Sequence, residues 1–202
     1  MMNVILDYDV GNLDSVQNGF KRVGIETIIS KDPSIIKNAK SLILPGVGAF
    51  GDAMVALSKS GLIPLIMNHV HSGKFLFGIC LGMQLLYERG YEHGTHQGLG
   101  LLKGSVIYLD TPLKVPHMGW NDLYFEKPSS PILKYIKPSD YVYFVHSYYV
   151  SSEDSELVAY TMYDKKIPAI VMKDNIIATQ FHPEKSGNVG LAILRAYGEM
   201  IQ

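Results

Sequence analysis

Short apolar runs alternate with helical patterns along the first 89 residues, and this alternation limits the fold more than any other feature of the chain. The runs are Val4–Leu6, Thr27–Ile29, Leu42–Leu44 and Phe75–Phe77. Continuous apolar runs of this kind are typical of parallel strands that helices cover on both faces. We therefore expect an α/β protein built on an open, doubly wound, mostly parallel sheet flanked by helices.

Two of the segments between these runs carry clear helix signals. Asn12 is suited to cap a helix that continues to Val23 and places Phe20 on its apolar face. A second helix is predicted between Gly61 and Val70, where apolar residues recur at a spacing of four. Both helices fit the connections that a parallel sheet requires.

From residue 104 onward the pattern changes to β-prone segments with turn residues between them. Antiparallel hairpins are expected there, with Lys173–Asn175 as one tight loop, before helical spacing resumes from Asn188 to Met200. We find no repeat and no break in composition, so residues 1–202 are predicted to form a single domain. The β-prone segments are 105–109, 141–150, 158–163, 169–173 and 176–181.

Composition limits the classes of partner. The chain has 18 Lys plus Arg and 19 Asp plus Glu, so its net charge of -1 favours neither nucleic acid nor an anionic membrane as partner. One cysteine cannot form an internal disulfide, and the first residues show no basic segment ahead of an apolar one. No apolar run approaches the roughly 18 residues that a membrane helix needs. We expect a cytoplasmic protein.

That one cysteine, Cys80, has a glycine two positions away on each side, Gly78 and Gly82. This pattern is typical of a nucleophile on a strained turn between a strand and a helix, because glycines let neighbouring backbone come close. By frequency alone, however, a lone cysteine is more often a buried core residue. The nucleophile interpretation therefore requires a base elsewhere in the chain.

His182 and Glu184 supply such a base and an acid to orient it. They lie two residues apart at the end of a predicted strand, which Pro183 stops, and in extended backbone both side chains point to the same side. A thiol needs a base to become a thiolate, and the base needs a third group to hold it. A surface pair of no consequence is the alternative. Together with Cys80, the pair favours a catalytic triad.

The segment Gly46–Gly51 matches the G-x-G-x-x-G pattern of dinucleotide sites. It follows the third strand instead of the first, and no acidic residue occurs in the region of 69–72, where such a site places one. We therefore reject a dinucleotide site and predict neither a cofactor nor a metal. The small residues of the segment suit the approach of backbone N–H groups to a substrate carbonyl.

Gly78–Gln84 and Gln180–Glu184 resemble the triad motifs of class I glutamine amidotransferases. The resemblance covers nearly the whole chain and narrows to the glutaminase subunits of imidazole glycerol phosphate synthase. One departure is Asp9, where many members carry glycine. The segments that carry the narrower resemblance are Asp7-Tyr8, Gly11–Leu13, Leu44–Phe50, Lys114–Asn121 and Phe144–Tyr149.

This resemblance implies an enzyme that hydrolyses L-glutamine to glutamate and ammonia. The ammonia would pass to a (β/α)₈-barrel cyclase subunit, in a heterodimer that acts as a lyase in histidine biosynthesis. The cyclase would make imidazole glycerol phosphate and aminoimidazole carboxamide ribonucleotide.

The resemblance also implies a role for individual residues. Cys80, His182 and Glu184 would form the triad. Val47, Gly48 and Leu81 would form the oxyanion hole, whose segment reorients around Gly46 and Val47 in the active state. Glutamine would be bound by Gly46, Gln84, Glu92, Ser147 and Tyr148. The interface with the cyclase would contain Asn12, His117, Met118, Trp120, Asn121 and Lys185.

Alternatives remain for the whole chain. It can be a related amidotransferase subunit that feeds a different synthase, such as one acting on a surface sugar, or a binding subunit without activity. A cysteine hydrolase or chaperone of related fold usually has histidine directly after the cysteine, and Leu81 counts against it.

Alternatives also remain for single residues. Glu92 is otherwise a solvated loop acid, Tyr148 and Trp120 are otherwise core aromatics, and Lys185 is otherwise an ordinary surface lysine.

Overall fold

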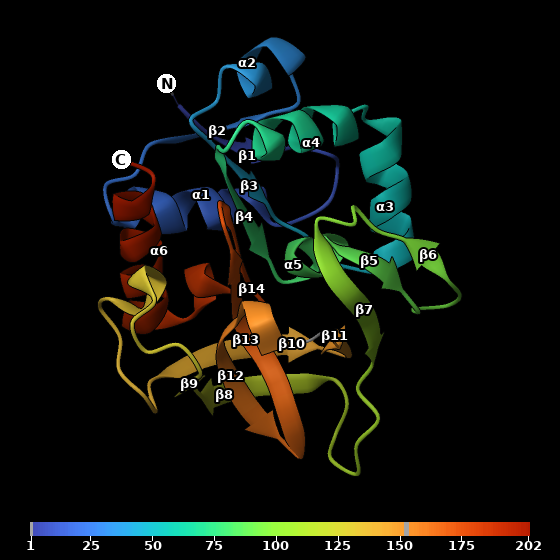
Figure 1. Cartoon of the computed structure of the whole chain (residues 1–202), viewed down its shortest axis with the longest axis vertical. Helices are drawn as coiled ribbons and strands as arrows, with labels where there is room; N and C mark the ends of the chain where they lie inside the picture. Colours follow the sequence, from blue (N-terminus) through green and yellow to red (C-terminus); the bar gives the residue numbers. More distant parts are fainter. Residues whose placement is uncertain (1, 152–153) are drawn as a thin grey trace.

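An eight-stranded sheet forms the centre of the computed structural model, which describes residues 2–151 and 154–202 (Figure 1). Its strand order is β2-β1-β3-β4-β14-β13-β12-β9, parallel from β2 to β14 and antiparallel beyond. The predicted mostly parallel sheet with antiparallel additions is confirmed. The strands are β1 (Asn3–Leu6), β2 (Thr27–Ser30), β3 (Ser41–Leu44), β4 (Phe75–Ile79), β9 (Tyr124–Phe125), β12 (Leu157–Tyr163), β13 (Lys165–Lys173) and β14 (Ile176–Thr179).

Helices cover both faces of the parallel part, so the sheet is doubly wound (Figure 1). Alternate residues of β1 show why the apolar runs are continuous. Val4 and Leu6 pack in the core on one side of the sheet, whereas Ile5 packs in the core on the other side. The first side carries α2 (Pro33–Lys37), α3 (Phe50–Lys59), α4 (Ile63–His71) and α5 (Leu81–Leu85), and the second carries α1 (Leu13–Arg22) and α6 (Gly187–Met200).

Local signals fix the ends of several helices. The side chain of Asn12 accepts a hydrogen bond from the Ser15 N–H at 3.2 Å and caps α1, as predicted. Pro64 lies in the first turn of α4, where its missing N–H has no intrahelical role. No single helix among the described residues is long and apolar enough to cross a bilayer. Together α3 and α4 meet the length and composition, but they are bent by 89° where they meet.

The chain departs from the predicted pattern after α5. Only five residues of helix follow Cys80 before β5 (Tyr87–Gly90), which pairs in parallel with β7 (Leu102–Tyr108). The sheet β11-β7-β5-β6 lies beside the main one and includes β6 (His96–Gln97) and β11 (Tyr148–Ser151). Tyr148 of this small sheet lines the pocket described below.

The predicted strand 141–150 is two strands. β10 (Tyr141–His146) pairs with β8 (His117–Asp122), whereas β11 pairs with β7. The chain therefore changes sheets at Ser147, and the sequence shows no turn residue pattern there because the pairing partners lie far away along the chain. The remaining elements are the short helices η1 (Pro131–Leu133), η2 (Asp154–Glu156) and η3 (Pro183–Lys185).

Candidate active site

Cys80 occupies a strained turn between β4 and α5. Its φ of 54° and ψ of -111° lie outside the regions that non-glycine residues favour. Both flanking glycines make this turn possible. A Cβ atom on Gly82 would overlap the carbonyl oxygen of Leu44, and one on Gly78 would lie 3.0 Å from the Met83 nitrogen. The backbone of β3 thus presses against the turn, and the thiol is presented at the carboxyl end of the sheet.

His182 and Glu184 meet as predicted, but for a different reason. Strand β14 ends at Thr179, and Glu184 lies in the short helix η3 instead of extended backbone. The turn of η3 brings Oε1 of Glu184 to 2.8 Å from Nδ1 of His182. Gly19 on α1 leaves room for this pair, because a Cβ atom there would lie 3.0 Å from Cβ of Glu184.

The ionisation of His182 follows from its neighbours. Burial lowers its pKa, but the hydrogen bonds and charges of Cys80 and Glu184 outweigh that effect and raise the pKa to about 9. A protonated imidazole beside a cysteine stabilises the thiolate, which is the nucleophilic form. The three side chains therefore have both the contacts and the charges that thiol activation requires.

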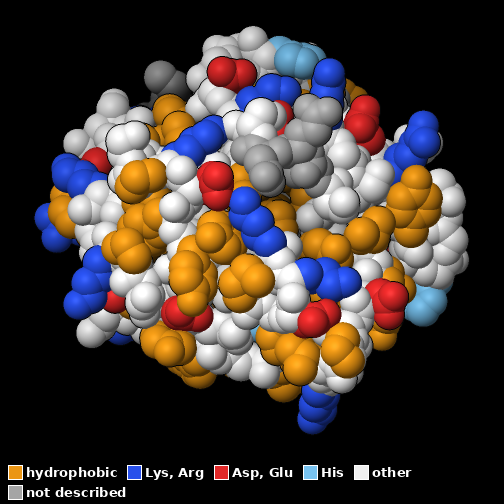
Figure 2. Space-filling view, turned by 60° about the horizontal axis from the view of Figure 1, so that its bottom comes forward, with side chains coloured by type: hydrophobic (Ala, Val, Ile, Leu, Met, Phe, Trp, Pro, Cys, Tyr) orange, Lys and Arg blue, Asp and Glu red, His pale blue; other side chains and the backbone are white. Residues whose placement is uncertain are grey.

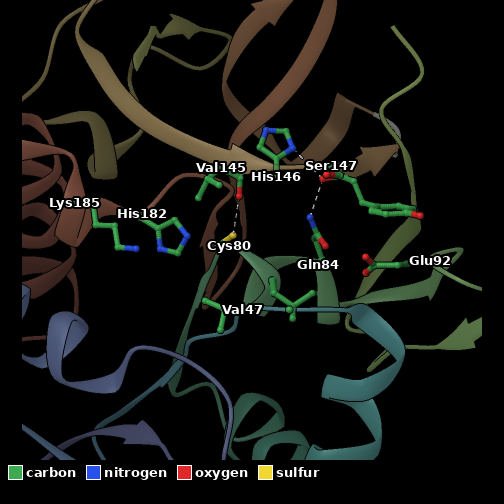
Figure 3. A pocket seen from close by; sticks show the side chains of 12 residues that line it. Val47, Cys80, Gln84, Glu92, Val145, His146, Ser147, His182 and Lys185 are labelled. Atoms are coloured by element: carbon green, nitrogen blue, oxygen red, sulfur yellow. Dashed lines mark hydrogen bonds between the residues drawn. The ribbon is translucent and has the colours of Figure 1, made fainter. Parts of the chain in front are cut away.

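A cavity of about 340 Å³ opens beside Cys80. In Figure 3, Cys80 lies at its centre, with His182 and Lys185 on one side and Gln84 and Glu92 on the other. Within residues 2–151 and 154–202, no group of three or more His, Cys, Asp or Glu side chains is arranged to hold a metal ion. The lining consists of Val47, Gly48, Cys80, Leu81, Gln84, Glu92, Val145, His146, Ser147, Tyr148, His182 and Lys185.

Nearly every predicted substrate or oxyanion residue therefore lines one cavity, and Gly46 is the exception. A Cβ atom on Gly46 would lie 2.9 Å from the Gly82 nitrogen and 3.0 Å from the Tyr8 hydroxyl oxygen. Gly46 packs against the turn at Gly82 and is not among the residues that line the cavity, so its predicted contact with substrate stays a prediction. The Tyr8 hydroxyl donates to the Pro45 carbonyl oxygen at 2.5 Å and fixes the start of this segment.

The candidate oxyanion donors come from two segments that line the cavity. Leu81 is the first residue of α5, and the first N–H groups of a helix have no intrahelical acceptor. Val47 and Gly48 line the same cavity from the loop before α3, and Gly48 has a φ of 91° that favours glycine.

Glu92 is not a solvated loop acid. Its Oε2 accepts a hydrogen bond from the Phe50 N–H at 2.7 Å. Phe50 begins α3, and the preceding residue, Ala49, has no side chain that can cap the helix. The same carboxylate lines the cavity, so it can receive a cation there while it holds the end of the Val47–Gly48 loop.

Gln84 joins two other segments near the cavity through hydrogen bonds of its side chain. Its Nε2 donates to the Tyr148 carbonyl oxygen at 2.9 Å and to Oε1 of Gln180 at 3.0 Å. Both amide hydrogens are thereby used, and Oε1 of Gln84 is left for a ligand. Sequence reasoning missed Gln180, His146 and Val145 as site residues. All three stand inside the quoted motifs, but no spacing rule singles them out.

The predicted interface residues divide into two groups along β8. Met118 is 60% exposed and Trp120 is 53% exposed, so Trp120 is not a core residue. His117 points to the other face of the strand and is fully buried, which contradicts its predicted place at the interface. Asn121, on the same face as His117, is half-buried and contacts that histidine at 2.8 Å.

The remaining two interface candidates lie at the surface. Asn12 and Lys185 are exposed, and Lys185 also lines the cavity. Trp120 approaches Gly187, two residues after Lys185. Figure 2 shows the face of the molecule that lies at the bottom of Figure 1, near β8, where hydrophobic side chains gather among charged ones.

Comparison with known proteins assigns the chain to a family. Residues 4–196 match the family described as glutamine amidotransferase class-I. The chain is 55% identical over 199 residues to the imidazole glycerol phosphate synthase subunit HisH of Lactococcus lactis, with 98% of both chains covered. It is 48% identical to the subunit of the same name from Aquifex aeolicus, with 98% of this chain and 96% of the relative covered.

Among solved structures, PurLQS from Thermotoga maritima aligns with a TM-score of 0.79 at 19% identity, covering 100% of this chain and 99% of that one. A structure described as a glutamine amidotransferase aligns with a TM-score of 0.75 at 23% identity, covering 96% and 98%. At these identities the two alignments establish the fold alone.

Proposed function

Because the chain belongs to the class I glutamine amidotransferases, and among them to the glutaminase subunits of imidazole glycerol phosphate synthase, we propose that Cys80 is the nucleophile of its reaction. The chain is a glutaminase that hydrolyses L-glutamine to glutamate and ammonia for histidine biosynthesis. One observation carries the assignment to this cavity: Cys80, on its strained turn, shares it with a histidine that is hydrogen-bonded to a buried glutamate.

In the proposed first half-reaction, the Cys80 thiolate attacks the carboxamide carbon of glutamine and forms a carbon–sulfur bond. The carbon–nitrogen bond then breaks, and protonated His182 gives its proton to the departing amine, which leaves as ammonia. Glu184 holds the imidazole in position and stabilises its charged form. The N–H groups of Leu81 and of the Val47–Gly48 loop would receive the negative oxygen.

In the second half-reaction, neutral His182 takes a proton from water. The resulting hydroxide attacks the glutamyl thioester, the carbon–sulfur bond breaks, and glutamate leaves with Cys80 again a thiolate. Both steps use the same imidazole, first as acid and then as base, and a pKa raised to about 9 keeps it protonated before the first step.

The cavity has a complementary group for each end of free glutamine. We assign the α-ammonium to Glu92 and the α-carboxylate to the backbone of Ser147 and Tyr148. Gln84 would contact the substrate through its remaining oxygen. These assignments are supported by the lining of the cavity and by the hydrogen bonds that already orient Gln84 and Glu92.

A subunit of this family works with a cyclase subunit, for which we propose a (β/α)₈ barrel docked on Met118, Trp120 and Lys185. Free ammonia is protonated at neutral pH and loses its nucleophilicity, so it should pass directly between subunits. We place this complex in the cytoplasm, where the free thiol of Cys80 stays reduced. The described chain would act as one domain, since the family match spans nearly all of it.

Glutamate release from glutamine, measured with and without the cyclase subunit, tests the proposal. We expect release that rises when the cyclase is added and that Cys80→Ala abolishes. Equal rates with and without the cyclase would contradict a partner-dependent site. Capture of a sugar-modifying synthase in place of the cyclase would support the alternative pathway, which the 55% identical relative disfavours.

A further inference from the structure

A row of buried hydrogen bonds runs from strand β8 to the backbone of the cavity. Oδ1 of Asn121 lies 2.8 Å from Nε2 of His117, and Nδ1 of His117 lies 3.0 Å from Nε2 of His146. Nδ1 of His146 lies 2.9 Å from the Tyr148 carbonyl oxygen. Neither histidine takes part in the proposed reaction, and both side chains are buried.

The row continues from Tyr148 to the nucleophile. The same carbonyl oxygen accepts from Nε2 of Gln84 at 2.9 Å, and this nitrogen also donates to Oε1 of Gln180 at 3.0 Å. The side-chain nitrogen of Gln180 lies 3.8 Å from Sγ of Cys80. Gln180 is fully buried directly after β14, so its amide has little freedom to turn.

Counting protons fixes the direction of every bond on the Cys80 side. A carbonyl oxygen only accepts, so Gln84 must present its nitrogen to Tyr148 and its second N–H to Gln180. Gln180 must then use its oxygen for Gln84, which leaves its NH₂ group for the sulfur. The Tyr148 carbonyl oxygen, which can only accept, therefore determines that Gln180 presents its NH₂ group to Cys80.

The same count fixes both histidine tautomers. His146 must carry its proton on Nδ1 to bond to Tyr148, and as a neutral ring it offers a bare Nε2. His117 must then donate from Nδ1 and offer a bare Nε2 to Asn121. The structure places Oδ1 of Asn121 against this bare nitrogen, so two acceptors would face each other. The count therefore requires a half-turn of the Asn121 amide, after which its NH₂ group donates to Nε2 of His117.

Protonation of either ring would make both of its nitrogens donors, and the tautomers would then no longer be fixed. Burial of the two rings opposes this protonation. Burial, with His117 as a second cause, lowers the pKa of His146 to about 3. Burial also lowers the pKa of His117. The imidazole of His117 stacks on the rings of Phe144 and Tyr163, at centroid distances of 4.9 Å and 4.0 Å. Both rings are therefore neutral and fixed in place.

Resting on the proposed role of Cys80, we propose that Gln180 is a further catalytic residue, whose N–H stabilises the thiolate, and that His117 and His146 are positioning residues. They tie the Ser147–Tyr148 backbone to the inner face of β8. Met118 and Trp120 occupy the outer face of that strand. A displacement of β8 on docking would thus be transmitted to the sulfur through bonds of fixed direction.

Ionisation of Cys80 changes its sulfur from a weak hydrogen-bond donor to an acceptor, and the proposed role of Gln180 matches this change. As a thiol, Cys80 donates weakly to the Val145 carbonyl oxygen at 4.0 Å. As a thiolate it can only accept, and Gln180 then supplies a donor.

Alkylation of the full-length protein by iodoacetamide tests this role, because Cys80 is the only cysteine. The rate is measured against pH for the wild type and for Gln180→Met, which keeps the length of the side chain but removes the N–H. Because the variant loses a hydrogen bond to a charged group, we expect the midpoint of its rate against pH to lie about one to two pH units above that of the wild type. An unchanged midpoint would overturn the role of Gln180. If wild-type complex also releases no glutamate, the proposed function itself fails.

Nitrogen NMR of the wild-type protein labelled with ¹⁵N-histidine tests the predicted tautomers of the two histidines. We expect His117 and His146 both as Nδ1–H tautomers, assigned by the loss of their signals in His117→Gln and His146→Gln. Nε2–H tautomers in the wild type would overturn the fixed direction.

A variant at the far end of the row adds a functional readout. Asn121→Asp places an acceptor where a donor is required, so we expect His117 to become protonated on Nε2 and the KM for glutamine to rise at least threefold. Asn68→Asp, which adds the same charge on the exposed side of α4, is the matched control and should change neither. A control that behaved like Asn121→Asp, or an unchanged tautomer in Asn121→Asp, would contradict the proposal.

Discussion

Nδ1 of His182 lies 2.8 Å from Oε1 of Glu184, and the two side chains are only 5% and 2% exposed. The pKa of His182 is raised from 6.5 to about 9, so the folded protein binds this proton more tightly than the unfolded chain does. The resulting stabilisation is complete below about pH 6.5 and is lost as the pH rises through about 9.

Glu184→Gln should reduce that pH dependence, because it removes the charge that favours imidazolium. Urea unfolding of the wild type should show a free energy of unfolding that falls across this window by at most about 1.4 kcal/mol per pH unit. The variant should show a smaller fall. The same slope in both proteins would contradict the electrostatic coupling.

Glu92 should contribute to two kinetic constants through two contacts. Glu92→Gln retains an oxygen for the Phe50 N–H but loses the charge, so we expect a higher KM for glutamine with kcat largely kept. Glu92→Ala loses the cap of α3 as well and should also lower kcat and cost about 1 kcal/mol of stability.

Ala49→Ser provides the control for that capping effect. Ala49 has the extended backbone of a capping residue, with a φ of -87° and a ψ of 142°. Serine there should restore stability and kcat in the Glu92→Ala background, but not KM. If the two Glu92 variants had equal kcat, the capping contact would be irrelevant to the reaction.

Gly82→Ala should destabilise the protein by about 3 kcal/mol, because its Cβ would overlap the Leu44 carbonyl and neither backbone can move away. Gly73→Ala separates this clash from simple backbone strain. Gly73 has a φ of 80° with open space around it, so only about 1–2 kcal/mol should be lost. Thermal or urea unfolding gives both values, and equal losses would argue against close packing at the turn.

Trp120 should report docking of the cyclase. It is the only tryptophan and is 53% exposed, so burial in an interface should move its fluorescence emission to shorter wavelength. Trp120→Phe should remove the signal and weaken binding about tenfold or more, as expected of an aromatic residue at the centre of an interface. An emission spectrum that stays constant through a saturating titration would place the interface elsewhere.

The parallel part of the fold could be predicted from the sequence because its strands are buried on both faces. Val4, Ile5 and Leu6 face two cores, and such a run leaves few alternatives. The sheet change at Ser147 could not be predicted, since it depends on pairing with distant residues: His146 pairs with His117 of β8, and Tyr148 pairs with Tyr108 of β7. No local pattern records a long-range pairing.

In the candidate site, too, local features could be predicted from the sequence and long-range ones could not. The turn at Cys80 was visible in its glycines, whereas the place of His117 required the register of β8, which decides the face of every side chain on it. Asp9 is accounted for by its backbone. Its φ of 64° is in the left-handed region, where aspartate is tolerated better than most residues, so it fits a turn that would otherwise favour glycine.

The most direct test of the account replaces the nucleophile and supplies ammonia from outside. The complex of the cyclase with Cys80→Ala is assayed for imidazole glycerol phosphate synthesis, once with glutamine and once with an ammonium salt. We predict that the glutamine-dependent rate is abolished while the ammonia-dependent rate stays at the wild-type level. Loss of both rates, or retention of the glutamine-dependent rate, would contradict the assignment of Cys80 as the nucleophile that releases ammonia.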